Sequence, residues 1–142
     1  MKNKPILIVA GEPNSIFLEI FFKAIKFTKF KRPIILICSK KLIKLQMTKL
    51  KFKKKIKLVT PSNLSLETLD NKSINLINVN YSQTSAFEKI SNKSNFYIKK
   101  CFDIAFRIIK LGVTDRFING PISKKNFLSK KFLGITEFIS NK

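Results

Sequence analysis

Short apolar runs alternate along this chain with longer segments of mixed polarity, and the apolar runs predict strands. Continuous apolar residues at 6–10 and 34–38 are typical of strands that a sheet buries on both faces. Shorter and less regular apolar patterns at 55–60, 74–79 and 116–119 predict three further strands.

Helices are predicted between these strands, where apolar residues recur at helical spacing. One helix follows the first strand, with Asn14 or Ser15 as its N-cap. Its apolar positions are Phe17, Ile20, Phe21 and Ala24. Residues 40–50 and 91–111 predict two more helices, and Gly112 suits the position just past the end of the second.

The order of these elements predicts an α/β fold with a mostly parallel sheet flanked by helices. Strand, helix and strand fill residues 6–38, and such a unit implies parallel strands joined by a right-handed crossover. The segments 62–73 and 81–86 are polar and rich in turn-forming residues, which predicts loops. Neither a repeat nor an internal boundary divides residues 1–142, so we interpret them as one α/β lobe.

Two turns at predicted strand ends carry Gly, Pro and polar side chains, and open α/β sheets bind ligands at such turns. They are Gly11-Glu12-Pro13 and residues 119–124. In the second turn, Gly120 permits close backbone approach to a ligand, free N–H groups at the next helix attract anions, and Lys124 adds positive charge. The alternative is an ordinary tight turn in which Ser123 caps a helix that begins at Lys124.

A third polar segment, residues 134–138, follows the second turn. Thr136 offers a hydroxyl and, near a helix start, a free N–H, and both groups can contact a phosphate or a carboxylate. The alternative is that Thr136 is only the N-cap of a short helix.

The sequence contains no histidine, so this chain holds no Ser-His-Asp triad, no Cys-His pair and no histidine-ligated metal. It also lacks the GxGxxG and GxxxxGK[ST] patterns of nucleotide-binding loops. Cys38 and Cys101 lie in apolar patterns, so we interpret them as buried hydrophobic residues of a protein in a reducing compartment. The acidic residues are scattered, and we interpret most of them as surface or capping residues.

The amino terminus predicts neither a signal peptide nor a membrane span. Its basic residues precede the apolar run at 6–10, whereas a signal peptide needs roughly 7–15 apolar residues and a spanning helix roughly 20. We therefore expect a cytoplasmic protein that makes no membrane contact.

The formal net charge is +21, from 29 basic and 8 acidic residues, and the basic residues are densest at 40–57. Such a segment is found at nucleic-acid or anionic-membrane binding sites, but it is more often a solvated surface. Only three of the basic residues are arginine, the preferred phosphate-binding residue, and the abundant Lys, Ile, Asn and Phe share A/T-rich codons. The segment has one aromatic residue, Phe52, where single-strand binding would favour several. Nucleic acid is therefore the less favoured interpretation.

Together, these motifs resemble the 4-hydroxythreonine-4-phosphate dehydrogenase family. Its members open with a strand and a Gly-Glu/Asp-Pro turn, as residues 9–13 do here. They carry a strand that ends in Thr-Gly-Pro, followed by a polar residue and lysine, similar to residues 119–124, and then Gly-His-Thr-Glu, similar to residues 134–137. The predicted helix at 91–111 fits the family helix before the second motif. The order and spacing of the motifs agree along the whole chain.

The resemblance implies an NAD-dependent oxidation of 4-phosphohydroxy-L-threonine in pyridoxal phosphate (vitamin B6) biosynthesis. It also implies a three-layer α/β/α lobe like that of isopropylmalate dehydrogenase, a homodimer, and a divalent metal held by histidines that lie downstream in the family. By position in the family motifs, the residues that line the phosphorylated substrate are Thr136, Ile135, Gly120 and Lys124. No catalytic, metal-binding or cofactor-binding residue is carried over to this chain.

The sequence departs from the family in both outer motifs. Ile135 stands where the family has histidine, so a hydrogen bond to the substrate is lost. Residues 14–19 lack the glycines of the family loop. Since family members are more than twice as long, we expect residues 1–142 to be an incomplete, amino-terminal part of a two-lobe enzyme, inactive alone and binding neither NAD nor metal. The alternative is a non-catalytic, basic nucleic-acid-binding module.

These expectations share one geometric requirement. The loops that contain Glu12 and Thr136 must meet above the same edge of the parallel sheet to receive one phosphorylated molecule.

Overall fold

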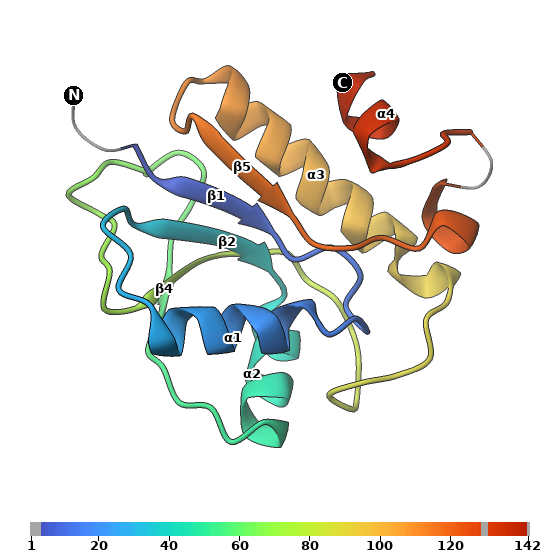
Figure 1. Cartoon of the computed structure of the whole chain (residues 1–142), viewed down its shortest axis with the longest axis horizontal. Helices are drawn as coiled ribbons and strands as arrows, with labels where there is room; N and C mark the ends of the chain where they lie inside the picture. The colour runs from blue at the N-terminus through green and yellow to red at the C-terminus, as the bar shows by residue number, and fades with distance from the viewer. Residues whose placement is uncertain (1–3, 129–130, 142) are drawn as a thin grey trace.

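A five-stranded, all-parallel sheet forms the centre of the computed structural model, which describes residues 4–128 and 131–141 (Figure 1). Its strand order is β3-β4-β2-β1-β5. The strands are β1 (Ile6–Val9), β2 (Ile34–Cys38), β3 (Ile56–Leu58), β4 (Ile74–Asn78) and β5 (Arg116–Asn119). All five predicted strands and the parallel arrangement are confirmed. The first residues of the basic amino terminus, 1–3, and residue 142 lie outside the described residues.

Helices cover both faces of the sheet, which confirms the predicted α/β class. Helices α1 (Phe17–Phe27) and α2 (Lys40–Lys49) pack on one face. Helix α3 (Asn95–Lys110), which follows the short 3₁₀ turn η1 (Asn92–Ser94), packs on the other face. Figure 1 shows the sheet between these two helical layers.

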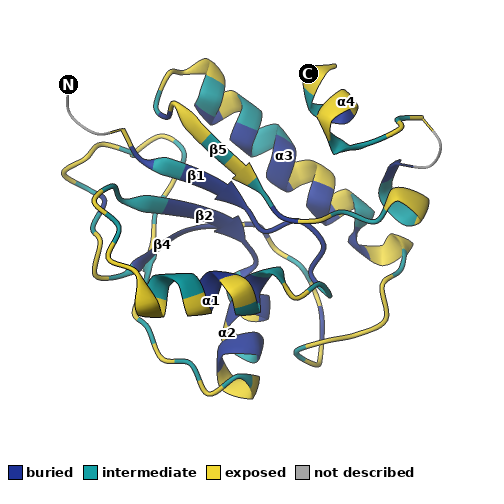
Figure 2. Ribbon diagram, in the orientation of Figure 1, coloured by how far each residue is buried: buried dark blue, intermediate teal, exposed yellow. Residues whose placement is uncertain are grey.

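The continuous apolar runs are explained by two separate hydrophobic cores. Along β1, Leu7 and Val9 enter the core beneath α3, whereas Ile8 and the following Ala10 enter the core beneath α1 and α2. Successive residues of a strand point to opposite faces, so a strand covered on both sides must be apolar at every position. Figure 2 shows the central strands buried and the outer helical surfaces exposed.

The start of α1 differs from the prediction. The N-cap position is occupied by Ile16, not by Asn14 or Ser15, and no side chain caps the helix. The Ser15 hydroxyl accepts a hydrogen bond from the N–H of Phe17 at 3.3 Å, while the Asn14 side chain is used in a distant loop contact. The buried face also differs slightly, because Ile20 is exposed and Leu18 lies in the core instead.

Helices α2 and α3 are both followed by a residue with positive φ. Gly112 follows α3 with φ +70°, which confirms its predicted position. Lys51 follows α2 with φ +52°, and the N–H groups of Lys51 and Phe52 donate to the carbonyls of Thr48 (3.2 Å) and Met47 (2.9 Å). These paired bonds form a Schellman motif, which the sequence did not suggest because a lysine occupies the usual glycine position.

The carboxyl-terminal segment packs against α3 through aromatic rings. It contains the five-residue π-helical turn η2 (Lys124–Leu128) and the helix α4 (Ile135–Ser140). The Phe138 ring lies 5.4 Å from that of Phe102 in α3 and 5.3 Å from that of Phe127 in η2, both edge to face. None of the helices in the described part of the chain has the length and apolar character needed to cross a membrane.

Candidate functional site

The loops after β1 and β5 diverge at the carboxyl edge of the sheet, which is where open α/β sheets bind ligands. The two strands are neighbours and parallel. From β1 the chain continues to α1 on one face, whereas from β5 it continues to η2 on the face that α3 covers. The point where these two loops leave the sheet is therefore its topological switch point.

The loops after β1 and β5 contact each other directly. The N–H of Glu12 donates to the carbonyl of Pro121 at 2.8 Å, and the N–H of Gly120 donates to that of Val9 at 2.7 Å. A Cβ on Gly120 would clash with the carbonyl of Ala10. Gly11 has φ +76°, and a Cβ there would lie 2.9 Å from the Gly120 backbone. In this structure the glycines thus allow close approach between the two loops.

Glu12 is buried at this junction and is an exception to the interpretation of most acidic residues as surface or capping residues. Only 4% of the residue is exposed. One carboxylate oxygen accepts a hydrogen bond from the Ser94 hydroxyl at 3.0 Å, and the other accepts one from the N–H of Asn14 at 3.2 Å. Since Ser94 directly precedes α3, the carboxylate joins the β1 loop to the start of that helix.

The segment 83–88 also contacts the β1 loop, and no sequence pattern predicts this role. The Asn14 side-chain oxygen accepts a hydrogen bond from the N–H of Glu88 at 2.8 Å. The Gln46 amide, fully buried in α2, donates to the carbonyls of Pro13 (2.9 Å) and Ala86 (3.0 Å). These partners are far apart in sequence, so no local pattern could have revealed them.

The four predicted substrate residues divide into two pairs. Gly120 is buried at the loop junction, and Lys124 is exposed at the first residue of η2. The predicted cap of this turn is confirmed, because the Ser123 hydroxyl accepts a hydrogen bond from the N–H of Asn126 at 3.1 Å. Ile135 and Thr136 lie on α4, where Ile135 packs against the core beneath α3 and Thr136 is exposed.

The interpretation of Thr136 as an N-cap is wrong. Gly134 occupies that position in an extended conformation, and α4 already begins at Ile135. The aromatic contacts of Phe138 attach α4 to the α3 layer. That Thr136 faces the junction of Glu12 and Gly120 stays a prediction.

The two cysteines are inert, as expected. Both are free and buried. Burial raises the pKa of the Cys38 thiol to about 12 and also raises the pKa of Cys101. A thiol that stays protonated at neutral pH is a poor nucleophile, so neither cysteine fits a catalytic role.

The residues of this chain do not fit the metal that the resemblance implies. Histidine is absent from the sequence, and the described residues contain no group of three or more Cys, Asp or Glu side chains that could hold an ion. A histidine-bound divalent metal would need ligands from outside this chain.

The chain has an α/β fold, and solved enzymes share this fold. No protein-family model and no curated protein matches the sequence. Among solved structures, the chain superposes on a 4-hydroxythreonine-4-phosphate dehydrogenase from Burkholderia phymatum with a TM-score of 0.82 and 16% identity, over 99% of this chain and 44% of that one. The enzyme of that name from Klebsiella pneumoniae gives 0.81 and 17%, over 98% and 44%.

These comparisons confirm the expected resemblance at the level of the fold. The chain spans less than half the length of either solved structure. At such identities, the shared fold is the finding, and the activity of the neighbours does not transfer with it.

Proposed function

We propose that this chain belongs to the first lobe of a dehydrogenase that oxidises 4-phosphohydroxy-L-threonine with NAD. The observation that carries the proposal is the superposition over 99% of the chain on an enzyme named for that phosphorylated substrate. The Gly11-Glu12-Pro13 and Gly120-Pro121 turns support it, since they meet at the switch point of the sheet. Activity would belong to the whole, two-lobe protein, which we propose to be a cytoplasmic homodimer.

Within this site, the residues of the chain would bind and orient the phosphate end of the substrate. Lys124 is exposed beside the loop junction and supplies a positive charge. Thr136 is exposed and supplies a hydroxyl. Ile135 is partly buried against the core, and its side chain can neither donate nor accept a proton. The chain would therefore contribute to binding and exclude water, without carrying out proton transfer at position 135.

NAD, when bound, would accept the hydride from the substrate alcohol. We assign neither NAD nor the metal to residues of this chain, because it lacks both a dinucleotide fingerprint and histidine.

Calorimetric titration of the chain with 4-phosphohydroxy-L-threonine tests the proposal. A charge-assisted contact to an exposed lysine predicts that Lys124→Gln weakens binding by about fivefold. Lys110→Gln, an equally exposed position near the far end of α3, is the matched control and should leave Kd unchanged. Equal effects of the two substitutions, or no binding by the unaltered chain, would refute the assignment.

A further inference from the structure

Charge is distributed unevenly over this molecule. Residues 20–66, which form most of α1 and all of β2, α2 and β3, contain 14 basic residues and no acidic residue. The rest of the chain carries 15 basic and all 8 acidic residues. A codon bias toward lysine does not remove Asp and Glu from one segment, so composition alone does not explain this asymmetry.

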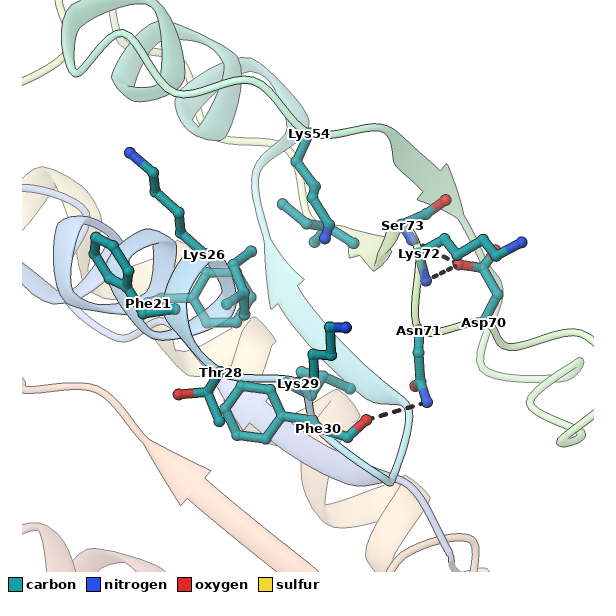
Figure 3. Close-up of a pocket in the computed structure, with 14 residues that line it drawn as sticks. Phe21, Lys26, Thr28, Lys29, Phe30, Lys54, Asp70, Asn71, Lys72 and Ser73 are labelled. Carbon is teal, nitrogen blue, oxygen red and sulfur yellow. Dashed lines mark hydrogen bonds between the residues drawn. The ribbon is translucent and has the colours of Figure 1, made fainter.

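The basic segment surrounds three adjoining hollows. The first, of about 700 Å³, lies at the start of α2, and the second, of about 1140 Å³, lies between α2 and β3. The third, of about 660 Å³, lies between the end of α1 and the start of β4 (Figure 3). Neighbouring hollows share Lys40 and Lys44 or share Lys54, so together they form one groove.

We call this surface the lysine groove; it is formed by residues 26–30, 40–48, 51–56 and 70–74, and ten lysines line its three hollows. Its one acidic residue is Asp70. That carboxylate accepts hydrogen bonds from the N–H groups of Lys72 (2.9 Å) and Ser73 (2.6 Å) and pairs with Lys57 at 3.6 Å. Within the described residues, no ion pair engages a lysine that lines the groove. Their mutual repulsion therefore favours a polyanionic ligand.

Aromatic side chains accompany the lysines, more than the sequence alone suggested. Phe27 is 78% exposed and lines the third hollow with Phe30. Lys29 and Lys54 project into the same hollow (Figure 3). Phe52 lines the second hollow and stacks on the buried Phe22, with ring centroids 4.7 Å apart. A basic track with accessible rings is the combination that binds single-stranded nucleic acid, whose bases stack while its phosphates meet cations.

We propose that the lysine groove binds single-stranded nucleic acid, with phosphates along α2 and the 51–55 loop and a base stacked on Phe27. The aromatic rings that line the hollows beside the lysines favour this ligand over a membrane, because bases can stack on the rings while phosphates meet the lysines. The proposal is independent of the dehydrogenase function, since Gly120 and Lys124 do not line the groove.

Fluorescence anisotropy with a labelled single-stranded RNA of about 20 nucleotides tests this proposal. Binding should weaken steeply as salt rises from about 50 to about 200 mM, because each phosphate contact releases counterions. Combining Lys29→Gln, Lys44→Gln and Lys54→Gln should weaken binding at least tenfold and reduce the log–log salt slope by about 2, at about 0.7 per phosphate on a single strand. Phe27→Ala should weaken binding about tenfold through lost stacking.

The control combines Lys93→Gln, Lys100→Gln and Lys110→Gln, which removes the same charge from exposed positions in η1 and α3. It should weaken binding less than threefold. Circular dichroism of each variant checks that the fold is retained. If both triple variants weaken binding equally, net charge alone explains the binding, and the proposal that the lysine groove is the binding site is wrong. Absence of RNA binding at about 50 mM salt, or displacement of bound RNA by anionic vesicles at equal charge, would also overturn it.

Discussion

The carboxyl-edge junction and the lysine groove are built on opposite principles. At the junction, Gly11 and Gly120 bring two loops into backbone contact, and a buried Glu12 joins them to α3. Few other residues could replace them, because the glycines permit close backbone approach and Glu12 supplies a buried hydrogen-bond acceptor. The groove instead uses many exposed lysines with no ion-pair partner in the described structure. Substitutions should therefore have large single effects at the junction and small, cumulative effects in the groove.

The largest expected effect is that of Gly120→Ala. The new Cβ would overlap the Ala10 carbonyl, which is backbone and cannot move without disturbing β1, so the cost should reach about 3 kcal/mol or more. The matched control is Gly112→Ala, which meets no atom within 4 Å and pays only for its positive φ, about 1 kcal/mol. Urea unfolding of both variants measures the difference. If both variants lose the same free energy of unfolding, the close contact between the two loops does not explain the effect at Gly120.

Glu12→Ala should have the next largest effect. It removes the carboxylate that accepts from the Asn14 N–H and from the buried Ser94 hydroxyl, which keeps the Ser91 carbonyl as an acceptor at 3.2 Å, so the cost should be about 1–3 kcal/mol. Glu67→Ala at an exposed loop position is the control and should change the free energy of unfolding by less than about 0.5 kcal/mol. The same urea experiment decides. A Glu12 variant as stable as the Glu67 variant would contradict the role of the buried carboxylate.

In contrast to the junction substitutions, Lys51→Gly in the lysine groove should stabilise the fold. Glycine adopts the left-handed conformation of this position without steric cost, and the gain should be about 0.5–1 kcal/mol. Lys53→Gly, in the same loop without a positive φ, removes the same charge and should give no gain. Thermal unfolding of the pair separates the backbone effect from the charge effect. A Lys51→Gly protein that melts below the parent would disprove the strained cap.

The smallest effect concerns pH and Asp70, the acidic residue of the groove. Burial raises the pKa of Asp70, but the N–H groups of Ser73 and Lys72 and the charge of Lys57 outweigh it and lower the pKa below its usual value. Stability from this group is thus present above the unfolded pKa, near 4, and is lost as pH falls through the lower folded value. Urea midpoints at descending pH should fall less for Asp70→Asn than for the parent. Identical pH profiles for the parent and the Asp70→Asn variant would show that the Asp70 carboxylate does not contribute to stability.

The sequence was sufficient for the fold because two-sided burial leaves a clear pattern. Ile6–Val9 and Ile34–Cys38 are apolar at every position since each face of the sheet is covered by a helix. The glycines of the two turns were equally visible, because a close backbone approach excludes other residues.

The site was only half visible, since its polar contacts join residues far apart in the chain. The Gln46 amide donates a hydrogen bond to the carbonyl of Pro13, and the Ser94 hydroxyl donates one to the carboxylate of Glu12. In both pairs the partners lie far apart in the sequence. No spacing rule links such pairs. The interpretation of Thr136 as a cap is wrong for a local reason. Threonine is a common N-cap, but here Gly134 takes the extended conformation that precedes α4.

Chemical-shift mapping by NMR during titration with 4-phosphohydroxy-L-threonine distinguishes binding at the loop junction from binding at the lysine groove, because one spectrum reports on both regions. We expect the amide signals of Gly120, Lys124 and Thr136 to shift together with one Kd, while those of residues 51–55 do not shift. Shifts confined to the residues of the lysine groove would contradict the proposed site. They would mean that the substrate phosphate binds the general positive charge of the molecule and not the junction of the two loops.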